Sequence, residues 1–311
     1  PGPSMSFPIA RPMNVALGVT LIIAAAFLIS VQDVIVKGFD GVLPLWQLFA
    51  LRGLFTAPLL ILFAWTTIRS GPLLADALNP WALLRGACIA FGLFGFYAAL
   101  PFISLATAGA GIYLAPIFMT LFSARLLGEP VGPRGWFGVI LGFVGVLVLL
   151  KPGSDSFSPW AILPVIGAIF YALGHTLTRL KCQHISTPSL AFSYNLNMTF
   201  GSLAVAGGLL LFPPGPDLAQ ALPFVFGAWQ MPDLPLWGAL FAMGVIFATI
   251  AVLLSAAYKI APPPTVGTFE YSYLIFAVIW DVTVFGLVPS ATTLLGILLI
   301  VGAGLLVIRS K

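Results

Sequence analysis

Ten long apolar runs constrain this chain more than any other feature. Each run is bounded by proline, glycine or charged residues, and each has roughly the 20 apolar residues that cross a bilayer as a helix. Charged residues make up 7% of the chain and hydrophobic residues 60%, so little remains for any soluble domain. Membrane barrel strands alternate over about 10 residues, unlike these continuous runs. We therefore predict an all-α integral membrane protein with ten transmembrane helices.

Proline begins several of the predicted helices, as suits a first turn whose N–H would be unpaired anyway. The predicted ranges are 14–37, 44–68, 80–101, 105–127, 133–150, 160–180, 188–212, 235–260, 263–285 and 291–308. Pro116 lies inside the fourth range and is expected to kink that helix. Residues 1–4 precede Met5 and look like a cloning remnant within a tail of residues 1–13. The first run is too long for a cleaved signal.

A degenerate copy of residues 107–151 returns at residues 265–309. At this offset of 158 residues, Thr107 aligns with Thr265, Gly109 with Gly267, Tyr113 with Tyr271, Gly128 with Gly286 and Gly138 with Gly296. We therefore predict two five-helix repeats, residues 14–151 and 160–309, joined by a loop of residues 152–159. Five is an odd number, so the second repeat has the opposite topology. Inverted repeats around a central cavity are typical of secondary transporters.

Positive charges predict the orientation in the membrane. With a cytoplasmic N-terminus, ten of the 13 Lys and Arg fall on the inner side, whereas Lys37 and Lys151 fall outside and Arg52 lies within a span. Such a bias favours two cytoplasmic termini. The ten are Arg11, Arg69, Arg85, Arg125, Arg134, Arg179, Lys181, Lys259, Arg309 and Lys311. A Pro-rich outer loop is expected at residues 213–234.

The chain resembles the EamA branch of the drug/metabolite transporter superfamily. The resemblance rests on Arg52, residues 106–109 (ATAG), 114–116 (LAP), 127–130 (LGEP), Gly138 with Gly142, residues 269–272 (FEYS) and 285–286 (FG). It implies ten helices in two inverted repeats, in a bacterial inner membrane. Within the family, the chain resembles the YddG-type exporters of aromatic and other neutral amino acids. One departure is Leu287, which stands where the first repeat has Glu129, so a symmetric role for Glu129 is not expected.

Ionisable side chains inside a span are costly and should face a cavity or a partner. Glu270 is the leading candidate for binding a substrate amine or a coupling proton, with a helix-pairing role as the alternative. Arg52 could bind a carboxylate, or else neutralise an acid such as Asp33, Glu270 or Asp281. His175 could change charge near neutral pH, although a neutral, hydrogen-bonded histidine is the simpler interpretation.

Two further acids have local interpretations. Asp33 precedes Lys37 by four residues, which predicts an ion pair on one helix face. Asp281 lies close to a helix end, where contact with water would suffice.

Uncharged polar side chains within the spans can bind a neutral, zwitterionic solute without a large desolvation cost. Interhelical hydrogen bonding is the alternative for each of them. The candidates are Gln32, Tyr97, Tyr113, Tyr171, Asn195, Asn197, Tyr271 and Tyr273.

These patterns favour an inner-membrane secondary transporter that exports neutral or aromatic amino acids by alternating access. A proton-coupled multidrug exporter is the nearest alternative, and an intramembrane enzyme is a remote one because no GxGD, HExxH or GxSxG motif occurs. Cys88 and Cys182 give no support for a disulfide or metal site. We expect no cofactor and no nucleic acid. The expected partners are a small solute, the bilayer and, if transport is coupled, protons, with a monomer preferred over a dimer. The small residues at Gly138 and Gly142 are interpreted as packing within one chain.

Overall fold

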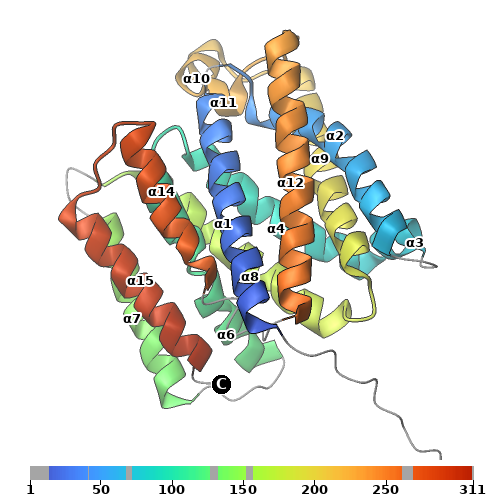
Figure 1. The fold of residues 1–311 in the computed structure, drawn as a ribbon. Coiled ribbons are helices and arrows are strands. Elements are labelled where there is room, and N and C mark those ends of the chain that lie inside the picture. The colour runs from blue at the N-terminus through green and yellow to red at the C-terminus, as the bar shows by residue number, and fades with distance from the viewer. Residues whose placement is uncertain are drawn as a thin grey trace, which may run out of the picture.

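The computed structural model of the chain describes residues 14–40, 42–67, 72–126, 132–151, 157–260 and 269–309, and these residues form a helical bundle (Figure 1). The helices of the first half are α1 (Val15–Gly38), α2 (Leu45–Thr67), α3 (Leu73–Ala77), α4 (Pro80–Ala99), α5 (Leu105–Ile112), α6 (Ala115–Leu126) and α7 (Pro133–Leu150). Side chains cap several first turns. Asn14, for example, accepts a hydrogen bond from the Leu17 N–H at 3.0 Å.

The second half begins with a short 3₁₀ helix, η1 (Pro159–Ala161). Its α-helices are α8 (Ile162–Lys181), α9 (Thr187–Leu211), α10 (Pro216–Ala221), α11 (Pro223–Phe226), α12 (Leu234–Ile260), α14 (Ser272–Thr283) and α15 (Ala291–Arg309). The predicted ninth helix is described only from residue 269 onward. Every other predicted range coincides with one helix or a pair of helices.

The helices have the length and composition of membrane spans. Seven segments among the described residues are long and apolar enough to cross a membrane, and Ser272–Thr283 and Ala291–Leu306 are shorter apolar helices. The predicted all-helical membrane protein is therefore confirmed. In Figure 1, α1 begins and α15 ends at the lower end of the bundle, opposite α10 and α11.

The predicted fourth helix is interrupted, not continuous. It divides into α5 and α6 at a turn formed by Tyr113 and Leu114. Pro116 is the second residue of α6, and a proline cannot donate the hydrogen bond that a helix would make to the carbonyl of residue 112. The kink predicted from Pro116 is thus confirmed, and its effect is to break the helix.

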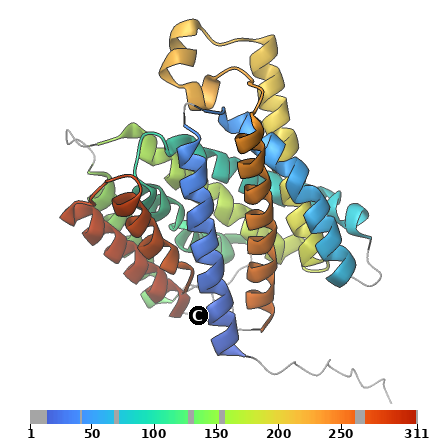
Figure 2. The ribbon, with the colours of Figure 1, turned by 45° about the horizontal axis from the view of Figure 1, so that its top comes forward.

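Each half packs against the other along most of its length. Helix α7 runs along α15, α4 along α8, α2 along α9, and α1 along α12; the last pair is side by side in both views (Figures 1 and 2). Glycines permit the closest approach: a Cβ on Gly92 of α4 would lie 2.5 Å from the carbonyl oxygen of Gly167 on α8. A Cβ on Gly142 would meet the side chain of Ile117, so packing within the chain is confirmed for Gly142.

Asp281 ties α14 to α5, and its predicted contact with water is wrong. The side chain is 1% exposed. Its carboxylate accepts hydrogen bonds from the backbone N–H groups of Leu105 at 2.8 Å and Ala106 at 2.7 Å. These donors have no partner inside α5, because they lie in its first turn. The N-terminus of α5 is also the positive end of its helix dipole, which favours an anion. The first N–H groups of α5 thus supply the hydrogen bonds that a carboxylate at membrane depth needs.

The predicted outer loop contains α10 and α11 and is anchored to α2. The Trp46 indole donates to the Val225 carbonyl at 2.8 Å. The Gln47 side chain donates to the carbonyl of Gln230 and accepts from its N–H. The loop is therefore docked through hydrogen bonds between side chains of α2 and its own backbone, despite its many prolines.

We predict that Asp281→Ala destabilises the protein far more than Asp233→Ala. Asp281→Ala strands two buried N–H donors, which costs at least about 2 kcal/mol. Asp233 accepts from the Leu236 N–H at 2.9 Å at an exposed helix start, where loss of a cap costs about 0.5–1 kcal/mol. Thermal unfolding of the two variants in one detergent measures the difference. Equal losses would show that burial of the Asp281 cap is unimportant.

Candidate functional site

A cluster of buried polar side chains lies between the two halves. We call it the central polar cluster, and it comprises Gln32, Asp33, Arg52, Tyr97, Tyr113 and Tyr273, which come from α1, α2, α4, the α5–α6 turn and α14. Sequence analysis singled out five of these six as candidate binding residues, and the fold brings all five together. The sixth, Asp33, was assigned a different role.

Arg52 is fully buried, and its guanidinium has no hydrogen-bond partner among the described residues. Its exposed fraction is 0%, and its guanidinium carbon lies 4.5 Å from the ring centroid of Phe49 and 4.6 Å from that of Phe247. Phe49 precedes Arg52 by three residues and so shares its face of α2. The two rings supply cation–π attraction, but none of the three guanidinium nitrogens has a hydrogen-bond partner among the described residues. The hydroxyl of Tyr194 is near but forms no hydrogen bond of acceptable geometry.

Asp33 carries an acidic charge close to this guanidinium. The two groups interact electrostatically, although they form no ion pair within the described part of the chain. Asp33 Oδ2 accepts a hydrogen bond from the Tyr273 hydroxyl at 2.7 Å, whereas Oδ1 has no partner there. The Tyr97 hydroxyl faces the same carboxylate and accepts a hydrogen bond from Gln32 Nε2 at 3.2 Å.

The predicted ion pair between Asp33 and Lys37 is wrong. Lys37 Nζ donates instead to the Ile103 carbonyl at 2.5 Å and lies 4.9 Å from the Phe285 ring centroid. The long side chain of Lys37 reaches the end of α1, where a backbone carbonyl accepts its hydrogen bond, whereas Asp33 is held by the Tyr273 hydroxyl. Asp33 is therefore part of the cluster, near Arg52, as the alternative considered for Arg52 allowed.

Aromatic side chains extend the cluster around Tyr113. The Tyr113 ring centroid lies 5.2 Å from that of Tyr273 and 5.7 Å from that of Tyr271. Glu270 is close enough to interact electrostatically with Tyr113, Tyr171 and Tyr271. This group adds tyrosine hydroxyls and one carboxylate beside Tyr113 and Tyr273.

His175 and Asn195 lie at the edge of this arrangement. The His175 ring is 4.4 Å from the Tyr171 ring, centroid to centroid, and its charged neighbour is Arg85. Asn195 Nδ2 donates to the Gly53 carbonyl at 3.4 Å, which joins α9 to α2. Asn197 Nδ2 donates to the Ser193 carbonyl of its own helix at 2.9 Å. Binding roles for these residues stay predictions.

Tyr194, Phe49 and Phe247 were not among the predicted site residues. Phe49 could have been found, because an aromatic residue three positions from a buried arginine shares its helix face. Phe247 and Tyr194 come from α12 and α9, and no local pattern links them to Arg52. Their positions depend on how the second half packs on the first.

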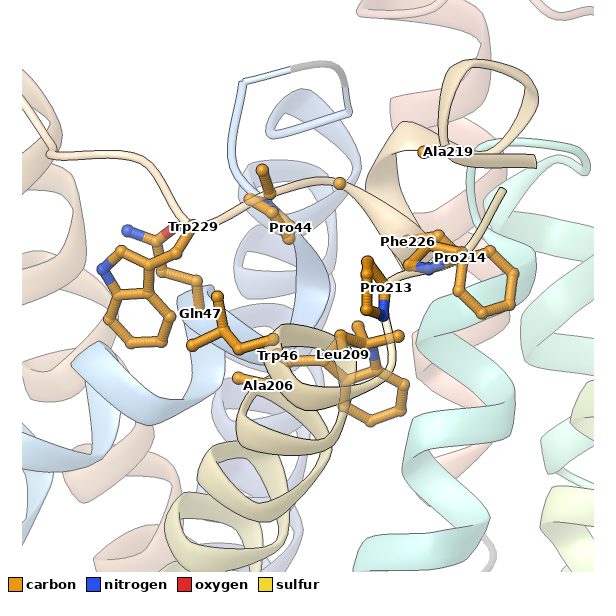
Figure 3. A pocket seen from close by; sticks show the side chains of 13 residues that line it. Pro44, Trp46, Gln47, Ala206, Leu209, Pro213, Pro214, Ala219, Phe226 and Trp229 are labelled. Carbon is orange, nitrogen blue, oxygen red and sulfur yellow. The ribbon is translucent and has the colours of Figure 1, made fainter. Parts of the chain in front are cut away.

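A pocket of about 250 Å³ lies under the predicted outer loop. Figure 3 shows Trp46, Trp229 and several prolines around it. Its wall is mostly apolar and contains no charged side chain. The pocket lies where the loop packs on α2 and α9. The polar side chains in its wall are those of Trp46, Gln47 and Trp229, and none of them is charged.

We predict that Tyr273→Phe and Tyr271→Phe differ in their effect on stability. Tyr273→Phe leaves Asp33 Oδ2 without its donor, which costs about 1.5–3 kcal/mol for a charged acceptor. The Tyr271 hydroxyl is buried and has no partner among the described residues, so its removal is close to neutral. Equilibrium unfolding in detergent measures both variants. Similar losses would show that the Tyr273–Asp33 bond adds no stability.

Comparison with known proteins gives the family. The EamA-like transporter family matches residues 16–151. The pseudopaline exporter CntI of Pseudomonas aeruginosa is 29% identical and aligns over 94% of this chain and 96% of its own. The riboflavin transporter of Vibrio cholerae is 30% identical over 71% of this chain and 68% of its own. The S-adenosylmethionine uptake transporter of Rickettsia prowazekii is 23% identical over 91% and 89%.

A solved structure supports the fold. It covers 94% of this chain and 95% of its own length, with a TM-score of 0.60 and 21% identity. The matched family and these relatives are transporters and not enzymes. The chain belongs to the EamA-like transporter family of the drug/metabolite transporter superfamily and is a multi-pass membrane transporter of small metabolites.

Proposed function

We propose that this protein exports small zwitterionic metabolites with an amino-acid head group, aromatic ones above all. The observation that carries the proposal is the buried, unpaired guanidinium of Arg52 beside a carboxylate with one unpaired oxygen, both within the described residues. A buried charge without hydrogen bonds is costly. A solute that supplies the missing partners would offset that cost.

Each end of such a solute has a counterpart in the central polar cluster. The fork of the Arg52 guanidinium suits a carboxylate, which it can bind through two parallel hydrogen bonds. Asp33 Oδ1 is an acceptor for an ammonium group. The rings of Phe49, Tyr97 and Tyr113 offer apolar faces for an aromatic side chain. A mostly apolar pocket with a few placed polar groups is what orients a small organic solute.

The pattern of helix contacts supports the inverted repeat that we infer for alternating access. In repeat order, α1 corresponds to α8, α2 to α9, α4 to α12, α5–α6 to the helix ending in α14, and α7 to α15. If the two halves are related by the repeat, each contact between helices should have a counterpart in which the halves are exchanged. The α4–α8 contact then corresponds to α12–α1, α4–α9 to α12–α2, and α6–α8 to α14–α1. All of these contacts occur. The pairs α2–α9 and α7–α15 map onto themselves.

The helix interruptions support the same repeat. The first falls at Tyr113 and the second at Tyr271, which separates residues 269–270 from α14. The two tyrosines are 158 residues apart, the offset of the sequence repeat, and their ring centroids lie 5.7 Å apart. Repeats of residues 14–151 and 160–309 would thus meet on an axis that passes between these rings. Transporters of this architecture bind their solute near that axis.

The relatives and the positive charges support the direction of transport and the sidedness that we propose. The pseudopaline exporter aligns with nearly all of both chains, which supports export, and YddG-type amino-acid exporters remain the finer assignment we favour. The bias of Lys and Arg supports cytoplasmic termini in a bacterial inner membrane. A single chain supplies the whole cluster, which supports a monomer as the working unit.

Glu270 supports a second candidate, a proton-coupled exporter. Its carboxylate interacts electrostatically with Tyr113, Tyr171 and Tyr271, and a titratable group there could bind a proton in alternation with the solute. Glu270→Gln would then abolish the pH dependence of transport while exchange at constant pH continues.

We predict that Arg52 and Asp33 recognise opposite ends of the solute, which counterflow in proteoliposomes can separate. Arg52→Lys should raise the KM for phenylalanine by at least about tenfold, because an ammonium cannot bind a carboxylate through a planar fork. It should leave exchange of phenylalaninamide, which has no carboxylate, unchanged. Asp33→Asn should weaken phenylalanine but spare 3-phenylpropionate, which has no amine.

Arg85→Lys is the matched control for a buried arginine. Arg85 Nε donates to the Thr178 hydroxyl and Nη1 to the Leu190 carbonyl, each at 3.0 Å, so both nitrogens already have acceptors within the protein. Its replacement should affect phenylalanine and phenylalaninamide alike. If Arg52→Lys weakened both solutes equally, Arg52 would have no role in recognising the carboxylate.

A further inference from the structure

Arg52 contacts two phenylalanine rings that come from different halves of the chain. The guanidinium carbon lies 4.5 Å from the centroid of the Phe49 ring and 4.6 Å from that of the Phe247 ring. Phe49 belongs to α2, like Arg52 itself, whereas Phe247 belongs to α12. The contact with Phe49 is therefore local to one helix, and the contact with Phe247 exists only where α12 packs against α2.

Close packing of α12 on α2 fixes the position of the Phe247 ring. The ring centroids of Phe55 on α2 and Phe241 on α12 lie 5.6 Å apart. A Cβ on Gly244 would lie 2.8 Å from the Cβ of Phe55, so the two backbones leave no room for a side chain there. Phe247 follows Gly244 by three residues, and Arg52 precedes Phe55 by three. One helical turn of each helix thus separates the closest approach from the contact with the guanidinium.

Contact with an aromatic ring leaves the hydrogen-bonding edge of a guanidinium available. The N–H groups of a guanidinium lie in its plane, and a ring packs on the face of that plane. The three guanidinium nitrogens of Arg52 have no hydrogen-bond partner among the described residues. The two rings therefore position the group without using the donors that would bind a carboxylate.

Two polar neighbours of Arg52 contribute less to its orientation. Asp33 interacts with it electrostatically but forms no ion pair with it within the described part of the chain. The Tyr194 hydroxyl is near but makes no hydrogen bond of acceptable geometry. The ring of Tyr194 also lies 5.4 Å from that of Phe247, centroid to centroid, so an experiment on Phe247 has to distinguish the two residues.

We propose that Phe247 is a positioning residue, which holds the Arg52 guanidinium in the orientation that binds the carboxylate of the solute. This inference rests on the proposed function, in which Arg52 binds that carboxylate. Because Phe247 belongs to the second half, a movement of α12 away from α2 removes one of the two rings and lets the guanidinium rotate. The affinity for the carboxylate then differs between the two packings of the halves, as release by alternating access requires.

Fluorination of the Phe247 ring tests this role with little change in its shape. Fluorine withdraws electron density from the face of the ring and weakens its attraction for a cation. With mono-, di- and trifluorophenylalanine at position 247, the KM for phenylalanine in counterflow should rise stepwise, by at least about threefold in the trifluoro protein. The maximal exchange rate and the KM for phenylalaninamide should stay unchanged. A ring that only fills space would give no stepwise rise.

Conventional variants separate the ring from its surroundings. Phe247→Leu should raise the KM for phenylalanine at least as much as full fluorination, and Phe247→Tyr should keep it low, because tyrosine retains the ring. Phe241→Leu is the matched control, since Phe241 packs on Phe55 from the same helix. Tyr194→Phe removes the nearby hydroxyl and should leave the KM unchanged. If Tyr194→Phe instead matched Phe247→Leu, that hydroxyl would be the positioning group and the proposal would be overturned.

An NMR signal of Arg52 measures the contact in the absence of any solute. In protein labelled with ¹⁵N-arginine, the Nε–H signal that disappears in Arg52→Lys belongs to Arg52. Phe247→Leu should shift this signal, because the magnetic effect of a ring 4.6 Å away is lost, and should broaden it as the guanidinium gains motion. Phe241→Leu should leave the signal in place.

The outcomes distinguish this inference from the proposed function. An equal KM across the fluorinated series, with Arg52→Lys still selective for the carboxylate, overturns the role of Phe247 and leaves the proposed function intact. If Arg52→Lys affects phenylalanine and phenylalaninamide alike, the proposed function fails, and the role of Phe247 in binding the carboxylate fails with it.

Discussion

Polar groups at membrane depth must find their partners inside the protein, and the whole arrangement depends on that constraint. Asp281 shows how the chain meets it. The carboxylate of Asp281 on α14 accepts hydrogen bonds from two N–H groups that have no partner within α5. A buried carboxylate and unpaired N–H groups would each be costly alone, and together they form one contact between two helices. Because α5 and α14 come from different halves, this exchange fixes the halves to each other at one end. Apolar packing alone would hold them less specifically.

The central polar cluster departs from this rule in one place. Asp33 Oδ2 has a donor, but Asp33 Oδ1 and the three nitrogens of Arg52 have none within the described residues. The rings of Phe49 and Phe247 reduce the cost of burying the guanidinium without neutralising it. In the function that we propose, the solute supplies the hydrogen bonds that these groups lack. Binding would then require a solute with charges of both signs at the right separation.

Sequence patterns predicted the helices well because apolar length and proline placement are local properties. They also singled out most residues of the cluster, since an ionisable or tyrosyl side chain inside a span must face a polar partner or a cavity. They failed where the partner comes from another helix. Asp33 was paired with Lys37 by spacing, yet its hydrogen bond is to Tyr273, which lies 240 residues away. Asp281 was assigned to water because no local pattern reveals that the start of α5 lies beside it.

The break at Tyr113 has a mechanical consequence. A continuous helix transmits a tilt along its whole length, whereas α5 and α6 are separate rigid pieces joined by a two-residue turn. The piece held by Asp281 is α5, and both pieces contact α8. The turn between them lets α6 tilt while the hydrogen bonds at the start of α5 keep their geometry. In the alternating access that we propose, switching between the two faces of the membrane would then cost rearranged apolar packing, with these hydrogen bonds as a fixed pivot.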